Sequence, residues 1–291
     1  MLRTISVFLE TIKFSHTVFA LPFALLSASL ASVRSGGWRA LDLVGILLCM
    51  IFARTAAMGF NRWADRRFDA ENPRTAVRAL PAGLLSPAAV LTITVASGVL
   101  FVASTALFIL ASDNWLPLYL SLPVLAFLLG YSYAKRWTDL AHLWLGIALA
   151  ASPVAAWIAV RGDVAWPPLL LAAAVALWVA GFDVIYACQD VEVDRKLGLR
   201  SIPARLGVGG AMHVARACHA AMLAALVAFG LATPEFGLFY WIGAAGVAAL
   251  LLYEHWLVRG RDLSRVNLAF LNVNGAISVA LLLATLADLY L

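Results

Sequence analysis

The sequence predicts an all-α fold, a polytopic membrane bundle of nine transmembrane helices with a cytoplasmic N-terminus. Composition supports the membrane class, because 63% of the 291 residues are hydrophobic, only 13% are charged, and the mean hydropathy is +0.91. A soluble domain carries about 25% charged residues, since it needs a polar exterior. These values exclude a soluble α/β enzyme and a secreted disulfide scaffold. Two further observations, the spacing of the apolar stretches and the distribution of positive charge, indicate helices and their orientation.

Nine apolar stretches have about the 20-residue length with which a helix crosses a bilayer. They lack the alternation of apolar and polar residues that a membrane β-barrel requires. The first stretch follows basic residues, as in a signal peptide, but its length and the eight stretches after it indicate a retained anchor. No linker separates the stretches, so residues 1–291 are expected to form a single domain. The stretches comprise residues 14–33, 41–60, 88–110, 115–134, 141–160, 167–187, 211–231, 236–257 and 267–290.

Lysine and arginine are distributed unevenly over the connections between these stretches. With the N-terminus inside, the inside segments hold sixteen of these residues and the outside segments hold three, Arg34, Arg39 and Arg161. This is the positive-inside bias of membrane proteins. A lipid bilayer as partner therefore accounts for the net charge of +5, and no nucleic-acid partner is expected. The three cysteines lie in or beside apolar stretches and are expected to be buried small residues.

The connection at residues 61–87 begins with an acidic pair that continues a predicted span. Its sequence, NRWADRRFDAENPRT, places Asp65 and Asp69 four residues apart, and residues at this spacing share one face of a helix. Adjacent carboxylates repel each other unless a cation lies between them. Mg²⁺ prefers such oxygen ligands, commonly together with the oxygens of a substrate phosphate. Asn61 adds a neutral oxygen on the same face.

A second connection, residues 188–210, repeats this arrangement. The segment DVIYACQDVEVDRK places Asp190 and Asp194 four residues apart, at the end of another span and on the same side of the membrane. A single pair of this kind is more often a solvated surface pair bonded to neighbouring arginines. Two copies that face one compartment, both interleaved with Lys and Arg, favour a site for Mg²⁺ and phosphate oxygens instead.

Arg54 lies near the inner end of the second predicted span, about two turns before Asn61 and on the same helical stripe. An arginine in an apolar segment is costly, which favours a role in binding an anionic substrate group. The alternative is that its side chain extends to the lipid headgroups. Asn267, Asn272 and Asn274 in the last span are expected to form interhelical hydrogen bonds. The five histidines share no ligand spacing, so none is assigned to a metal.

Both acidic segments resemble signatures of the UbiA superfamily of intramembrane prenyltransferases. NRWADRRFDAENPRTAVRALPAG resembles the first signature, N-x-x-x-D-x-x-x-D followed by RT and R-x-L-P-x-G. DVIYACQDVEVDRKLGLRSIPARLG resembles the second, D-x-x-Y-x-x-x-D-x-x-x-D followed by a G-x-x-S stretch and R-x-G. The run YSYAKRWT, from Tyr131 to Thr138, also matches. The resemblance is greatest to the 4-hydroxybenzoate polyprenyltransferases of quinone biosynthesis.

The resemblance implies an enzyme of the bacterial inner membrane, with Mg²⁺ as cofactor and an active site that faces the cytoplasm. It would transfer a polyprenyl group from a polyprenyl diphosphate to an aromatic acid, 4-hydroxybenzoate, in ubiquinone biosynthesis. The alternative acceptor is a naphthoate-type acid of the futalosine route to menaquinone. The rival classes are a polytopic transporter, which would place charges at mid-span, and a CDP-alcohol phosphotransferase, whose D-G-x-x-A-R motif this sequence lacks.

The predicted site consists of groups with different roles. Tyr186 is expected to stabilise an allylic carbocation with its aromatic face. The four aspartates of the acidic pairs are expected to be catalytic as metal ligands, and the complete ligand set is Asn61, Asp65, Asp69, Asp190 and Asp194. The residues expected to bind diphosphate are Arg66, Lys135, Arg136 and Lys196. The residues expected to bind the acceptor are Arg54 and Asp183. Arg54 would bind the carboxylate of the acceptor, and Asp183 would hold either the hydroxyl of the acceptor or Tyr186.

Overall fold

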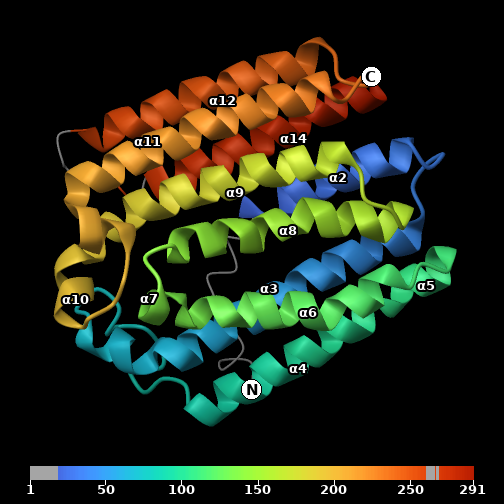
Figure 1. Ribbon diagram of the computed structural model, residues 1–291. Coiled ribbons are helices and arrows are strands. Elements are labelled where there is room, and N and C mark those ends of the chain that lie inside the picture. Colours follow the sequence, from blue (N-terminus) through green and yellow to red (C-terminus); the bar gives the residue numbers. More distant parts are fainter. Residues whose placement is uncertain (1–18, 260–265, 267–268) are drawn as a thin grey trace. The chain divides into compact units, whose positions relative to one another are not determined.

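The computed structural model describes residues 19–259, 266 and 269–291 (Figure 1). This part of the chain is helical and contains no β-strand, which confirms the predicted all-α membrane fold. The described residues divide into two compact units, one of residues 40–134 and one of residues 19–39 with residues from 135 onward. The prediction that residues 1–291 form one domain stays a prediction.

Eight helices in the described part are long and apolar enough to cross a membrane. A further apolar helix, α2 (Leu21–Val33), is shorter, and the predicted first span at residues 14–33 begins outside the described residues. The count of nine and the cytoplasmic N-terminus therefore stay predictions. The eight long helices are Ala40–Glu71, Pro87–Ser112, Leu116–Trp137, Ala141–Arg161, Trp166–Lys196, Ile202–Leu231, Leu238–Leu257 and Phe270–Tyr290.

The first unit is built on the long helix α3 (Ala40–Glu71), against which α4 (Pro87–Ser104) and α6 (Leu116–Gly130) pack (Figure 1). Its 32 residues extend about 48 Å. This length exceeds the membrane thickness, so α3 continues past the apolar stretch and carries the first acidic motif as helix. The short α5 (Ala106–Ser112) follows α4, and the 3₁₀ turn η2 (Tyr131–Tyr133) follows α6.

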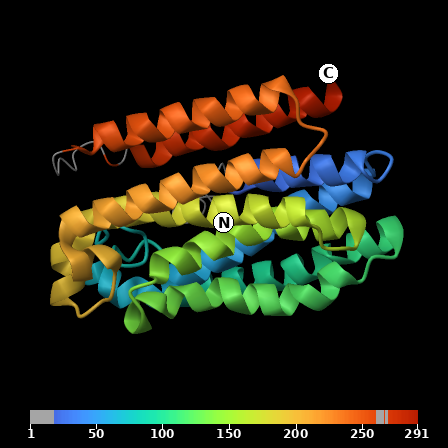
Figure 2. The same cartoon turned by 45° about the horizontal axis from the view of Figure 1, so that its top comes forward.

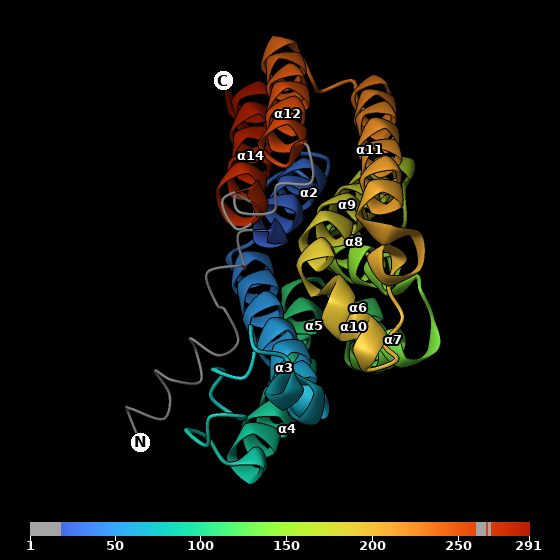
Figure 3. The same ribbon diagram turned by 90° about the vertical axis from the view of Figure 1, so that its left-hand side faces the viewer.

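The second unit is centred on α9 (Trp166–Ala187), which packs between α8 (Ala141–Arg161) and α11 (Ile202–Leu231). The helix α12 (Leu238–Leu257) pairs with α14 (Asn274–Tyr290), as Figures 2 and 3 show. The helix α2 contacts both α8 and α14. The remaining elements are α7 (Ala134–Trp137), which joins the two units in sequence, η3 (Cys188–Asp190), α10 (Val191–Lys196) and η5 (Ala269–Val273).

The three arginines on the predicted outer side all have structural partners in the second unit. Arg34 donates two hydrogen bonds to Glu235, at 2.7 and 2.8 Å. Arg161 pairs with Asp163 at 3.1 Å, and Arg39 donates to the backbone carbonyl oxygen of Val160 at 2.5 Å. These exceptions to the positive-inside bias therefore connect helix ends.

The pair of Arg34 and Glu235 makes the stability of the second unit depend on pH. The pKa of Glu235 lies below its ordinary value, because Arg34 donates hydrogen bonds to the ionised carboxylate. A carboxyl group with a lowered folded pKa stabilises the fold above its unfolded pKa of about 4.3 and loses this effect as the pH falls through the folded value. Between about pH 5 and pH 3, the wild type should lose about 1 kcal/mol more stability than a Glu235→Gln variant. Thermal unfolding in detergent at both pH values measures this difference, and parallel losses would contradict the prediction.

Candidate active site

The first acidic motif lies on α3, as the helical spacing predicts. Asn61, Asp65 and Asp69 are residues of this one helix. The side chain of Asn61 donates from Nδ2 to Asp65 Oδ2 at 2.9 Å, and its Oδ1 accepts from the Arg62 guanidinium at 3.3 Å. Arg62 is buried, with 8% of its surface exposed. Metal ligation by Asn61 Oδ1 would therefore replace the contact with Arg62.

Asp69 has one oxygen paired and one oxygen without a partner. Arg78 donates to Asp69 Oδ1 at 2.7 Å, and Thr75 donates to the backbone carbonyl oxygen of Asp69 at 3.0 Å. Asp69 Oδ2 is buried and has no hydrogen-bond partner among the described residues. A buried acceptor without a partner is costly, so this oxygen is suited to a cation. Arg78 belongs to the first signature, but the sequence assigned it no role because the chain folds back through a loop to reach Asp69.

The two α3 arginines assigned to substrate binding lie in different surroundings. Arg54 is half-buried and lies on the same helical stripe as Asn61. Arg66 donates to the backbone carbonyl oxygen of Trp63 at 2.6 Å, and its guanidinium lies 4.7 Å from the centre of the Trp63 ring. The predicted role of Arg66 in diphosphate binding stays a prediction.

The second acidic motif differs from the first in its backbone. Asp183 and Tyr186 lie on α9, but the helix then passes through the 3₁₀ turn η3 before α10 begins. Asp190 ends η3 and Asp194 lies in α10, and both are buried, at 6% and 3% exposure. The second pair therefore spans the end of a 3₁₀ turn and the α-helix that follows it, whereas the first pair lies within one α-helix.

Asp194 is held by residues from the segments before and after it. Ser201 donates from Oγ to Asp194 Oδ2 at 3.0 Å, and Lys135 Nζ lies 3.7 Å from the same oxygen. The backbone N–H of Arg200 donates to the carbonyl oxygen of Lys135 at 2.7 Å, and its side chain donates to the carbonyl oxygen of Trp137 at 2.9 Å. The segment after α10 is thus hydrogen-bonded to α7, where Lys135 lies near Asp194.

Ser201 has two roles that a matched pair of variants separates. Its Oγ also accepts from the backbone N–H of Ala204 at 3.2 Å and so caps α11, as Ser86 caps α4 by accepting from Ala89 at 3.1 Å. Both Ser201→Ala and Ser86→Ala should therefore cost about 1 kcal/mol of stability. We expect Ser201→Ala alone to lower turnover, by about tenfold, because only Ser201 orients an aspartate. Equal turnover of the two variants would contradict this role for Ser201.

Tyr186 belongs to a cluster of aromatic rings in the second unit. Its ring centroid lies 4.4 Å from that of Phe270, which in turn lies 5.3 Å from Phe182. Phe182 meets Trp178 edge to face at 5.0 Å, and Phe19 contacts Phe270 at 5.2 Å. Such a cluster presents ring faces from α9 and η5, the arrangement that a carbocation requires. Only Tyr186 was assigned from the sequence, since Phe270 is 84 residues away from it.

The remaining predicted residues differ in exposure, and one partner was missed. Lys196 is exposed on α10 and Arg136 is half-buried in α7. Asp183 accepts a hydrogen bond from Nδ1 of His142 at 2.7 Å. No sequence pattern indicates this contact, because His142 lies 41 residues earlier and on a different helix.

The described residues contain no group of three or more His, Cys, Asp or Glu side chains close enough to hold a metal ion. Mg²⁺ does not require one, because it commonly binds one or two carboxylates and completes its six ligands with water and phosphate oxygens. The partnerless Asp69 Oδ2 fits this chemistry. The residues present are therefore suited to an ion that binds together with a phosphate.

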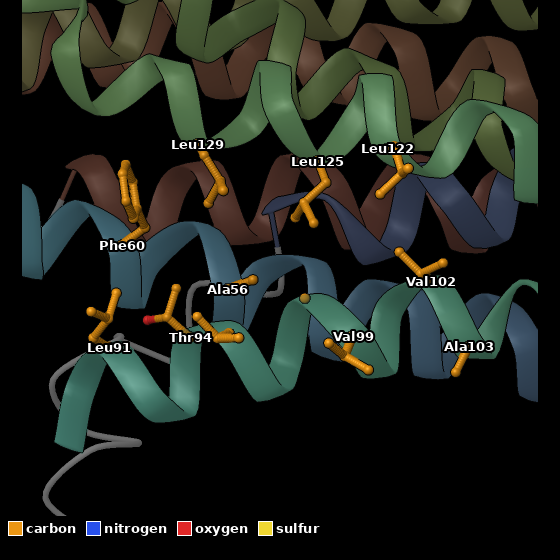
Figure 4. Close-up of a pocket in the computed structure, with 12 residues that line it drawn as sticks. Ala56, Phe60, Leu91, Thr94, Val99, Val102, Ala103, Leu122, Leu125 and Leu129 are labelled. Atoms are coloured by element: carbon orange, nitrogen blue, oxygen red, sulfur yellow. The ribbon is translucent and has the colours of Figure 1, made fainter. Parts of the chain in front are cut away.

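An apolar groove of about 620 Å³ lies in the first unit, and no aspartate of the first motif lines it. Figure 4 shows Ala56 and Phe60 of α3 on one side of it and Leu122, Leu125 and Leu129 of α6 on another. At 3.6 residues per turn, Ala56 and Phe60 point about 140° away from the Asn61–Asp65 side of α3. No charged residue lines the groove, so it is not the site of the metal or the diphosphate.

The long apolar helices define a multi-pass membrane protein, and two of these helices carry the carboxylate motifs. The sequence matches the model of the UbiA prenyltransferase family over residues 20–278, and the chain belongs to this family. The protein is therefore a prenyltransferase, which excludes the transporter and CDP-alcohol phosphotransferase alternatives.

Named relatives and solved structures agree with this assignment. A 4-hydroxybenzoate octaprenyltransferase of Nitrosospira multiformis is 34% identical over 229 residues, which cover 78% of this chain and 76% of the relative. The apo structure of a UbiA homolog from Aeropyrum pernix K1 is 34% identical with a TM-score of 0.83, over 94% of this chain and 98% of that one. A UbiA homolog from Archaeoglobus fulgidus bound to DMAPP and Mg²⁺ has a TM-score of 0.75 at 18% identity, covers 97% and 98% of the two chains, and shows the shared fold.

Proposed function

We propose that this protein transfers a polyprenyl group from a polyprenyl diphosphate to 4-hydroxybenzoate, in a Mg²⁺-dependent step of ubiquinone biosynthesis. The observation that supports this acceptor most directly is the 34% identity, over most of both chains, to a 4-hydroxybenzoate octaprenyltransferase. The reaction is proposed to occur at the bacterial inner membrane, at a site that faces the cytoplasm; the apolar helices and the bacterial relative support the membrane location. The fold neighbour bound to DMAPP and Mg²⁺ supports the diphosphate donor and the metal.

The carboxylates of both motifs would hold Mg²⁺ with the diphosphate. Asp69 Oδ2 has no hydrogen-bond partner among the described residues, and the buried Asp190 and Asp194 follow α9 directly. Bound Mg²⁺ supplies positive charge that stabilises the diphosphate as it leaves. Lys135, held 3.7 Å from Asp194, would add a further positive charge at the second motif. The other residues proposed for metal and diphosphate binding are Asn61, Asp65, Arg66, Arg136 and Lys196.

Aromatic rings and burial would protect the allylic carbocation that remains when the C–O bond breaks. The faces of Tyr186 and Phe270, with centroids 4.4 Å apart, can stabilise such a cation. Phe182 and Trp178, which continue the cluster, are buried at 2% and 0% exposure. This packing would exclude water, which otherwise captures the cation as an alcohol.

Two residues would orient the aromatic acid. Arg54 is proposed to bind its carboxylate, because a bidentate guanidinium–carboxylate pair fixes direction as well as position. Asp183, which is half-buried one helical turn before Tyr186, is proposed to bind its hydroxyl. An acceptor bound at both ends would present its ring to the cation in one orientation.

Product analysis by mass spectrometry tests this function. Purified protein in detergent would receive Mg²⁺ and a polyprenyl diphosphate, with 4-hydroxybenzoate, a futalosine-route naphthoate acid, homogentisate and haem as separate acceptors. We expect prenylated 4-hydroxybenzoate, and we expect EDTA to abolish it. Prenylation of the naphthoate acid alone would assign the protein to menaquinone biosynthesis. An intact diphosphate with every acceptor would contradict the proposed function.

A further inference from the structure

A buried histidine is bonded to the proposed acceptor-binding aspartate. His142 Nδ1 and Asp183 Oδ2 are 2.7 Å apart, and both residues belong to the second unit. The His142 side chain is completely buried, whereas 15% of the Asp183 side chain is exposed. An ionised carboxylate only accepts hydrogen bonds, so Nδ1 of His142 carries the proton that joins them. Nε2 of His142 has no hydrogen-bond partner among the described residues.

Close packing of α8 against α9 determines this contact. His142 lies in the first turn of α8, and Gly146 follows one turn later. A Cβ on Gly146 would lie 2.3 Å from the backbone carbonyl oxygen of Ala176 on α9. The two helix backbones can approach this closely only because position 146 is glycine. The histidine is thus attached to a rigid element and does not need to reorganise to hold Asp183.

Asp183 is less deeply buried than its neighbours on α9. Its neighbours Phe182 and Val184 are buried, at 2% and 0% exposure, while Asp183 and Tyr186 are both half-buried. Residues three apart share a helix face, with Cβ atoms about 5–6 Å apart. Asp183 Oδ1 makes no hydrogen bond to the described residues, since the contact with His142 uses Oδ2. His142 therefore holds one carboxylate oxygen of Asp183, and the other oxygen can bind a ligand beside Tyr186.

We propose that His142 is a positioning residue that holds Asp183 so that its free oxygen accepts the hydroxyl proton of the aromatic acceptor. This inference rests on the proposed function, because it needs an acceptor with a ring hydroxyl. Asp183 touches the substrate, whereas His142 acts through Asp183. His142 therefore does more than help to orient the acceptor. A carboxylate that rotated freely could still form a hydrogen bond to the hydroxyl, but it would not accept the proton in the geometry of attack.

The proton and electron pairs balance as follows. The Asp183 carboxylate takes the phenolic proton, and the ring carbon next to the oxygen forms a C–C bond to the first prenyl carbon. The bond from that carbon to the diphosphate oxygen breaks, and its electron pair leaves with the diphosphate. The ring carbon then loses its own proton to the diphosphate or to water, and Asp183 returns the phenolic proton to the oxygen. No oxidant or reductant is needed.

Two substitutions at His142 test this role. His142→Leu removes the hydrogen bond and keeps the site apolar, while His142→Gln keeps an N–H donor for Asp183. The exposed His213 on α11 provides the matched control, His213→Leu. Each variant would be assayed for prenyl transfer to 4-hydroxybenzoate and to 4-methoxybenzoate, which has no hydroxyl proton. Cleavage of the donor C–O bond would be followed separately, by exchange of the bridging oxygen of an isotopically labelled diphosphate. Thermal unfolding in detergent would establish that each variant is folded.

We expect His142→Leu to lower kcat for 4-hydroxybenzoate by about 10²-fold, the lower range for a general base, with unchanged donor cleavage and unchanged transfer to the methyl ether. His142→Gln should recover most of the lost kcat, and His213→Leu should match the wild type. Equal losses in donor cleavage and transfer, without recovery by His142→Gln, would mean that His142 is only structural. Full activity of His142→Leu would also overturn the inference. Absence of transfer by the wild-type protein to every acceptor would instead contradict the proposed function.

Discussion

An Asp69→Asn variant is expected to lose prenyl transfer by at least about 10³-fold while it keeps its fold, because it changes a proposed metal ligand without removing a structural contact. The asparagine Oδ1 can still accept from Arg78, which donates to Asp69 Oδ1 at 2.7 Å in the wild type. Its amide nitrogen would take the place of Oδ2, the buried oxygen without a partner. A cation is then repelled by a donor group at that position. Turnover measured over a range of Mg²⁺ concentrations should show a loss that excess Mg²⁺ does not restore.

Glu71→Gln is the matched control for this substitution. Glu71 is the last residue of α3, two positions after Asp69, and it is exposed. It removes the same charge at almost the same place without changing the proposed ligand set, so its turnover should stay within about twofold of the wild type. Wild-type turnover of Asp69→Asn would exclude the first motif as the metal site.

The second motif allows the same comparison within one turn. Asp190→Asn should lose activity as Asp69→Asn does, because Asp190 is buried at the end of η3. Glu192→Gln, an exposed residue between Asp190 and Asp194, is the control. A loss in Glu192→Gln as large as in Asp190→Asn would indicate a general effect of negative charge rather than specific ligation.

An Asn274→Leu variant is expected to lose about 3 kcal/mol of stability, because it breaks a buried polar chain that connects three helices. Asn274 Oδ1 accepts from Trp178 Nε1 at 2.6 Å, and its Nδ2 donates to Glu254 Oε1 at 3.0 Å. All three side chains are buried, at 0% to 1% exposure, and Glu254 Oε2 has no partner among the described residues. An ordinary interhelical hydrogen bond in a membrane protein contributes only about 0.6 kcal/mol. The larger loss comes from leaving Glu254 and Trp178 both without their hydrogen bonds.

A double-mutant cycle separates the cost of leaving Glu254 without its hydrogen bond from the cost of losing the asparagine side chain. Replacing both partners with apolar residues, as Glu254→Leu with Asn274→Leu, should be less destabilising than Asn274→Leu alone. Glu254→Gln keeps the acceptor for Asn274 and should cost no more than about 1 kcal/mol. Unfolding in a denaturing detergent would measure all four proteins. Strict additivity of the two leucine substitutions would contradict the coupling.

The sequence by itself determined the class, the helical fold and the positions of the acidic motifs. Helical boundaries such as Ala141–Arg161 follow from local hydropathy, because the bilayer imposes the length of each apolar segment. The first motif was placed on α3 correctly because residues 61, 65 and 69 obey helical spacing. Of the asparagines expected to bond helices together, Asn274 does so, Asn272 is exposed and Asn267 lies outside the described residues.

Only the tertiary structure decided which side chains meet, because periodicity gives the face of a helix and not the neighbour that the face contacts. Arg78 reaches Asp69 through the fold of a loop, and His142 reaches Asp183 through the packing of α8 on α9. The 3₁₀ turn before Asp190 is equally invisible in the spacing of the motif. Contacts such as these depend on the energies of packed helices, to which residues distant in sequence contribute, so the sequence pattern predicts the residue types of the site but not their partners.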